Sequence, residues 1–122
     1  MTINETLAAL AADGAIPGVR VYLELPTVTA VTPAIFVRDV DVDYTSTFGE
    51  ISVTVALVVL VQYADKATAP GKLNDLLDFA AVPAALVALG YSPQGATGKA
   101  LYTFGGATLL GAEIITTIDI PT

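Results

Sequence analysis

The sequence predicts an α+β fold in which helices pack on one face of a mainly antiparallel β-sheet. Segments with strand-like alternation of apolar and polar residues are separate from segments whose apolar residues recur at helical spacing. These segments follow the order α-β-β-β-α-α-β-β. Gly105-Gly106, between the last two strands, is typical of a hairpin and therefore of antiparallel pairing. The length of 122 residues suits one domain, and no internal repeat or linker divides it.

The first predicted element is an amphipathic helix over Ile3–Asp13. Thr2 and Glu5 have the spacing of a capping box, in which each residue satisfies a backbone amide near the other. Apolar residues then recur at helical spacing, and Gly14 is placed to end the helix. No basic leader precedes the apolar residues, so we do not expect a signal peptide.

Three strands are predicted next. In residues 19–25 Val and Leu alternate with polar residues, and a Pro/Thr loop over 26–33 follows. The second strand covers about Ala34–Tyr44. The third covers Ile51–Tyr63 and is apolar on both faces from Ala56 to Val61, as expected of a central strand covered on each side.

Helical spacing returns after Pro70, a residue that suits a first helical turn. A second, short helix is predicted at about Pro83–Leu89, and a loop over 91–98 follows it. The final hairpin is predicted to contain strands at Lys99–Phe104 and about Leu109–Ile120.

The composition is unusually apolar. Hydrophobic residues make up 54% of the chain and charged residues only 14%, whereas charged residues are about 25% of a typical domain. Small apolar residues could be scattered over the surface of a monomer. Alternatively, copies of the chain or neighbouring proteins cover much of that surface. The second interpretation predicts an oligomer.

The sequence offers few groups for chemistry. It has no histidine and no cysteine, which removes the commonest general base, the commonest metal ligand and every thiolate. The five basic residues occur singly in a chain of net charge −7, so ordinary nucleic-acid binding is not expected. The longest uncharged stretches are too short for a membrane span or are interrupted by Pro and Gly. We therefore predict neither an enzyme nor a membrane protein, and no cofactor.

One glycine-rich stretch, "GYSPQGATGKA", superficially resembles a phosphate-binding loop. Pro93 stands where the first glycine of that motif belongs, and Ala100 stands where Ser or Thr is needed. We therefore predict a surface loop that reaches a neighbouring subunit. The candidate contacts with a subunit or partner, from this loop and the earlier Pro/Thr loop, are Pro26, Pro33, Tyr91, Gly95 and Gly98.

The second strand contains an aspartate at every other position: Asp39, Asp41 and Asp43. Alternate residues of a strand lie about 6.6–7 Å apart on one face. One Mg²⁺ or Ca²⁺ ion, with oxygen ligands at about 2.0–2.6 Å, cannot easily collect three carboxylates at that spacing. Tyr44 also occupies the position of the glycine that an EF-hand loop requires. Three interpretations stay open: a metal or acid-base site, a solvated sheet face, and a wall that repels a polyanion.

Taken together, several segments resemble a small tail terminator protein of a long-tailed bacteriophage. They are "GVRVYLEL" before the Pro/Thr loop, "PAIFV", "ISVTVALVVLV" running into "ADKATAPGKLNDLLD", and "LLGAEIITTIDI". The resemblance is one of organisation and spans nearly the whole chain. It implies a ring, typically hexameric, that caps the tail tube, ends its elongation and joins it to a head-side connector or stopper protein.

DNA would pass through the centre of such a ring without sticking, and the protein would reside in the virion after assembly in the host cytoplasm. The resemblance implies no catalytic residue. An acidic lumen suits DNA passage, because cation–phosphate contacts would retain the DNA. Candidates for the lumen or a solvated ring face are Asp39, Asp41, Asp43 and Glu50. Alternatives are another neck or tail-tube protein, or a small carboxylate enzyme or binding domain that uses a divalent cation.

Overall fold

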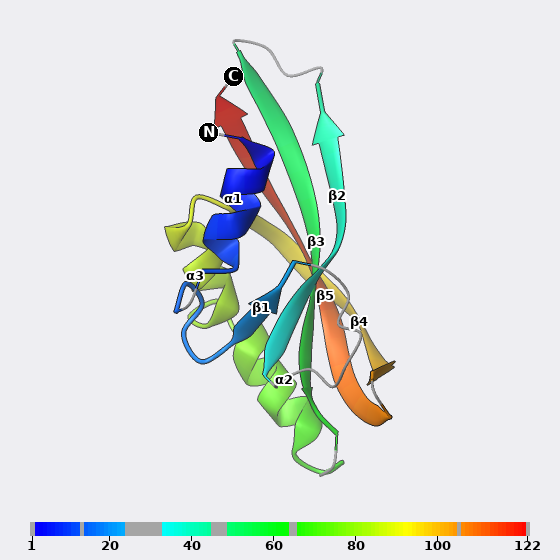
Figure 1. Cartoon of the computed structure of the whole chain (residues 1–122). Coiled ribbons are helices and arrows are strands. Elements are labelled where there is room, and N and C mark those ends of the chain that lie inside the picture. Colours follow the sequence, from blue (N-terminus) through cyan, green and yellow to red (C-terminus); the bar gives the residue numbers. More distant parts are fainter. Residues whose placement is uncertain are drawn as a thin grey trace.

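The computed structural model describes residues 2–12, 14–23, 33–44, 49–63, 66–104 and 106–121. Its elements are α1 (Ile3–Leu10), β1 (Arg20–Tyr22), β2 (Ala34–Asp43), β3 (Glu50–Gln62), α2 (Ala69–Leu77), α3 (Val82–Ala88), β4 (Ser92–Phe104) and β5 (Ala107–Pro121). The predicted α+β class and element order are confirmed (Figure 1).

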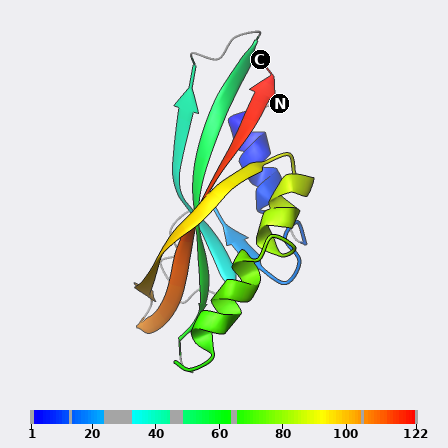
Figure 2. The ribbon, with the colours of Figure 1, turned by 180° about the vertical axis from the view of Figure 1, so that it is seen from behind.

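The strands form one five-stranded sheet in the order β1-β2-β3-β5-β4. Three of its strand pairs are antiparallel, as predicted, whereas the short β1 lies parallel to β2. The sheet is long and twisted, and the helices lie on one side of it (Figures 1 and 2). β3 is the middle strand and is buried without interruption from Val55 to Val61, which confirms its predicted central position.

The main core lies between the sheet and the helices. Alternate residues of β3 face the helices and are buried there, among them Val55, Leu57 and Val59. They pack with helix residues such as Leu10, Leu73 and Leu86, all of which are fully buried. Because α2 and α3 contribute only a narrow apolar stripe each, the sheet supplies most of the core.

The predicted cap of the first helix is present. The backbone N–H of Glu5 donates to the Thr2 hydroxyl at 3.1 Å, and that hydroxyl donates to a Glu5 carboxylate oxygen at 3.1 Å. The helix ends at Leu10, three residues before the predicted Asp13. Ala11 is the C-cap residue, and Gly14 follows with a φ of +77°, a left-handed conformation that glycine adopts readily.

The prediction of a loop over residues 91–98 is wrong. These residues begin β4, which pairs with β5 from Ser92 onward. The pairing register shifts between Pro93 and Gly95 and again between Thr97 and Ala100. Irregularities of this kind accommodate proline and glycine in a strand, provided that it lies at the edge of a sheet, as β4 does.

The first strand is also shorter than predicted. β1 covers Arg20–Tyr22 rather than residues 19–25, and it pairs only with Ala34–Phe36 of β2. Most of the predicted Pro/Thr loop, including Pro26, lies outside the described residues.

Two threonines that face the core differ in how their hydroxyl groups are satisfied. Thr116 of β5 is fully buried, and its hydroxyl has no hydrogen-bond partner among the described residues. Thr6 of α1 is 4% exposed, but its hydroxyl donates to the Thr2 carbonyl oxygen at 2.9 Å. A buried hydroxyl without a partner costs about 1–3 kcal/mol, whereas a satisfied one contributes about 0.5–1.5 kcal/mol.

We therefore expect Thr116→Val to raise the free energy of unfolding by about 1 kcal/mol, since valine keeps the shape and removes the hydroxyl. Thr6→Val is the matched control and should lower that free energy by about 1 kcal/mol. Urea denaturation of the two variants measures both changes. Destabilisation by Thr116→Val comparable to that by Thr6→Val would show that the Thr116 hydroxyl is satisfied.

Candidate functional surface

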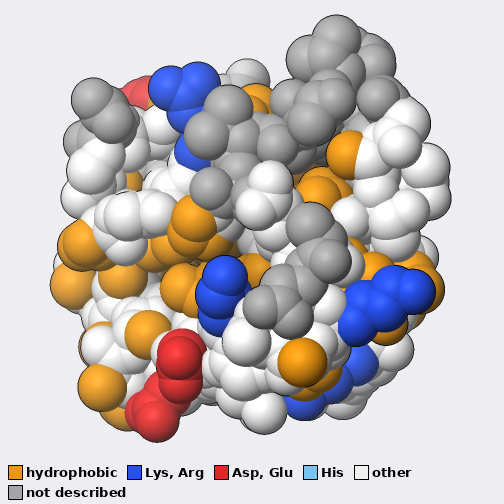
Figure 3. All heavy atoms as spheres, turned by 90° about the horizontal axis from the view of Figure 1, so that it is seen from below, with side chains coloured by type: hydrophobic (Ala, Val, Ile, Leu, Met, Phe, Trp, Pro, Cys, Tyr) orange, Lys and Arg blue, Asp and Glu red, His pale blue; other side chains and the backbone are white. Residues whose placement is uncertain are grey.

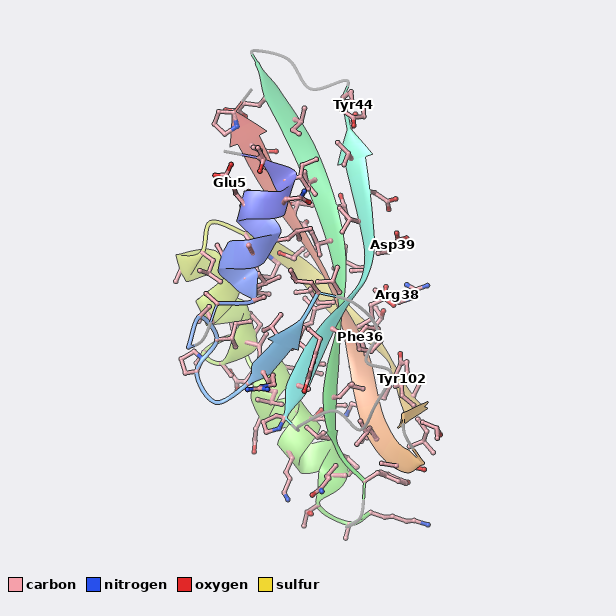
Figure 4. The ribbon with its side chains drawn as sticks, in the orientation of Figure 1. Glu5, Phe36, Arg38, Asp39, Tyr44 and Tyr102 are labelled. Atoms are coloured by element: carbon pink, nitrogen blue, oxygen red, sulfur yellow. The ribbon has the colours of Figure 1, made fainter. Side chains whose placement is uncertain are left out.

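The most distinctive surface of the molecule is the sheet face that no helix of the described residues covers, here called the open face. A register shift between Val37 and Asp39 in β2 decides what this face displays. Val37 packs in the helix-side core, and after the shift Val40 and Val42 pack against the same core. Alternation therefore directs the three aspartates of β2 to the open face. Figure 4 shows Asp39 pointing away from the helices.

Strand pairing gives two of these aspartates polar neighbours, whereas Asp39 lies opposite Ala56. Asp41 lies opposite Thr54, which pairs in turn with Thr117 of β5. Asp43 lies opposite Ser52, which pairs in turn with Asp119. Glu50 begins β3 at the same end of the sheet. We call this region the acidic half of the open face; it comprises Asp39, Asp41, Asp43, Glu50 and Asp119.

The carboxylates of the acidic half are exposed and spread along the strands. Within the described ranges, no group of three or more carboxylates is arranged to hold a metal ion. Neighbouring charges about 7 Å apart repel by only about 0.6 kcal/mol in water, so the row is tolerable without a counter-ion. These carboxylates can therefore present negative charge over one half of the sheet face.

The other half of this sheet face is apolar, and most of its residues are buried rather than exposed. Phe36 of β2 and Tyr102 of β4 meet edge to face, with ring centroids 6.3 Å apart and planes at 82° (Figure 4). We call this region the aromatic half; it comprises Tyr22, Ala34, Phe36, Val58, Leu60, Tyr102 and Leu109. At its border with the acidic half, Arg38 donates to a Glu113 carboxylate oxygen at 2.8 Å.

Basic residues gather at the end of the sheet opposite the acidic half. Arg20 begins β1, Lys66 follows β3, Lys72 belongs to α2, and Lys99 of β4 donates to the Asn74 side-chain oxygen at 2.6 Å. Figure 3, which views the lower end, shows Lys and Arg side chains distributed around it, with acidic side chains at more than one place along the margin. The charge of the protein is therefore polarised along the strands.

The structure brings the predicted acidic residues together but separates the predicted contact residues. Tyr91 is 2% exposed and its hydroxyl donates to the Thr6 carbonyl oxygen at 3.3 Å, so it is a core residue rather than a surface contact. Burial raises the pKa of its hydroxyl above the ordinary value of 10.0. Gly95 and Gly98 are exposed on the edge strand β4, and Pro33 is exposed before β2. Pro26 lies outside the described residues.

Comparison with known proteins leaves the chain without an assigned family. No known protein family and no curated protein matches its sequence. No helix in the described part of the chain is long and apolar enough to cross a membrane.

Asp119 was not predicted as a member of the acidic half. Ser52 of β3 pairs with Asp43 on one side and with Asp119 on the other, so the two aspartates lie in one row across the sheet. Alternation in "TTIDI" put Asp119 on one face of a strand, but only the order of strands in the sheet reveals that this face also displays the β2 aspartates. The ion pair between Arg38 and Glu113 was missed for the same reason, because 75 positions of sequence separate the two residues.

Proposed function

We propose that this protein is a structural subunit of a bacteriophage tail, which assembles into a ring that caps the tail tube and connects it to the head-side connector. The observation that supports this proposal best is the acidic half of the open face. It displays five carboxylates, and the basic residues lie mainly at the opposite end of the sheet. A channel wall of this kind repels a DNA polyanion instead of holding it.

The proposed ring places the open face toward the channel and the helices outward. Exposed charges act over about 8–10 Å at ordinary ionic strength, so carboxylates on the wall of a narrow channel influence DNA within it. The composition supports the same arrangement, because a chain with so few charged residues suits a protein whose surface is partly covered by subunit contacts. In this proposal the protein has no catalytic function and acts in the virion, after assembly in the host cytoplasm.

Light scattering and negative-stain electron microscopy of the purified protein, alone and mixed with tail tubes, test this proposal. We expect rings of defined mass, or monomers that bind the ends of tubes and stop their elongation. Long cylinders formed by the protein alone would identify it as a tube protein. A strict monomer at every concentration that also ignores tubes would contradict the proposal.

We expect Asp41→Lys to fold normally and to impair DNA passage. Asp41 is exposed, so the substitution leaves the core intact. One lysine per subunit of a hexameric ring would offer on the order of six phosphate contacts, a number that changes DNA affinity by roughly 10³-fold between 50 and 200 mM salt. Plaque yield and salt-dependent retention of linear duplex DNA measure the effect.

Asp75→Lys is the matched control, because Asp75 is exposed on α2 and the charge change is identical. It should leave plaque yield unchanged. Closed circular duplex DNA provides a second control, since it cannot thread a closed ring, and we expect the Asp41→Lys ring to retain only the linear form. Normal infectivity with Asp41→Lys, or equal retention of both DNA forms, would contradict a channel position for the acidic half.

A further inference from the structure

Both edges of the sheet expose strand backbone among the described residues. β1 covers β2 only along Ala34–Phe36, so the remainder of β2 up to Asp43 has no strand beside it in the described ranges. The backbone N–H of Val40 donates instead to the carboxylate of Asp39, at 2.9 Å. β4 forms the opposite edge and is exposed from Gln94 to Leu101. Exposed edges of this kind are templates for pairing with another strand.

The directions of the two edges are compatible. Successive antiparallel pairings from β2 through β3 and β5 to β4 make β2 and β4 run in opposite directions. A second copy in the same orientation can therefore add its β2 to the β4 edge of the first as an antiparallel strand. The open faces of the two copies would then form one continuous surface.

Charge selects this pairing over a symmetric pairing of two β2 edges. Two β2 edges would bring two rows of three aspartates together, which like-charge repulsion disfavours. The exposed part of β4, Gln94–Leu101, contains Lys99 and no acidic residue. Contact between β2 and β4 uses two different surfaces of the chain, and contacts of this type close into rings when the rotation allows.

An exposed aromatic ring beside the β2 edge and an apolar hollow beside the β4 edge are also complementary. Tyr44, which follows β2, is 75% exposed, and the alternation of Val40 and Val42 places it on the helix side of the sheet. On the helix side of β4 lies a hollow of about 240 Å³ between the strand and the α2–α3 region. Its lining includes Phe79, Pro83 and Pro93, and Phe79 is 69% exposed. A β2 strand added to β4 would bring Tyr44 to the side of this hollow.

We propose that the Arg38–Asp43 part of β2 pairs with β4 of a second copy, and that Tyr44 packs into the hollow beside Phe79 of that copy. This inference rests on the ring proposed above and names its subunit contact. The acidic half would become continuous from copy to copy, since each added β2 brings its aspartates to the open face.

Disulfide cross-linking tests the contact, because the natural chain contains no cysteine. In the double variant Tyr44→Cys/Phe79→Cys, oxidation should convert most of the protein into a ladder of linked species on non-reducing gels. The matched control Tyr44→Cys/Val87→Cys should stay largely monomeric on the gel, since Val87 is exposed on α3 outside the hollow. Light scattering of the reduced variants reports assembly independently.

The outcomes separate the contact from the ring. Linked species in the Tyr44→Cys/Phe79→Cys variant, without such species in the Tyr44→Cys/Val87→Cys control, would support the proposed contact. Rings that yield no linkage between positions 44 and 79 would contradict the proposed contact but not the ring. Linkage between two copies of Tyr44→Cys would contradict the proposed contact and indicate a symmetric β2 contact. Absence of any assembly, including on tail tubes, would overturn both proposals.

Discussion

Replacing Leu73 by aspartate should unfold the protein. Leu73 lies on α2, is fully buried and belongs to the core between the helices and the sheet. An unpaired carboxylate at this position would lose its hydration, and large destabilisations of more than about 4 kcal/mol arise in this way. Typical domains are stable by only about 5–15 kcal/mol. A loss well above about 4 kcal/mol therefore unfolds a domain whose stability is near the lower end of that range.

Far-UV circular dichroism and urea denaturation measure the effect. The matched control is Asn74→Asp, which places the same side chain at the next, exposed position of α2, within reach of Lys99. Its free energy of unfolding should stay within about 0.5 kcal/mol of the parent. Leu73→Ala should remain folded and cost about 2–5 kcal/mol, because it leaves a cavity. A cooperative, parent-like transition for Leu73→Asp would contradict the position of α2 over the sheet.

The order of elements could be predicted because each burial pattern is local. Alternation in β5 and in the outer parts of β2 and β3 follows from which side chains face the main core. The helical stripe around Leu73 has the same origin. The cap formed by Thr2 could also be predicted from the sequence, since a helix start depends on residues three positions apart.

The errors arose where the sheet departs from regular geometry. Pro93 and Gly98 are turn-forming residues, yet edge pairing with two register shifts keeps them in β4. A strand was predicted over residues 19–25, but its parallel pairing with β2 was not, because alternation within a strand does not reveal the direction of its neighbour. Alternation within β2 predicted one shared face for the aspartates, but only the register shift after Val37 identifies it as the face opposite the helices.

We expect Gly111→Ala to destabilise the protein, although alanine is normally the better residue inside a regular element. Gly111 lies in β5 on the open face, beneath the aromatic half. A Cβ atom there would lie 2.8 Å from a methyl carbon of Leu60 and 2.8 Å from a ring carbon of Tyr102. Leu60 is fully buried and cannot move aside easily. Overpacking of this kind costs about 1–3 kcal/mol.

A double-mutant cycle with Tyr102→Ala isolates the cause. If the Tyr102 ring lies over the β5 backbone at Gly111, the cost of Gly111→Ala should fall when the ring is absent, and the difference is the coupling energy. The remaining cost would come from Leu60. Gly95→Ala is the matched control, because no atom of the described residues, its two chain neighbours excepted, lies within 4 Å of its added Cβ. It should be neutral or stabilising by up to about 1 kcal/mol.

Equal costs of Gly111→Ala with and without the tyrosine would show that the ring does not cover β5. That result would leave the methyl group of Leu60 as the only one of these two neighbours that requires a glycine at this position. The coupling matters for the open face as a whole, because the Tyr102 ring spans from the edge strand β4 over β5 and meets Phe36 from β2. The contact links β2 and β4 through side chains across the two strands between them, so its loss should weaken the sheet near the edge at which we propose that a second copy binds.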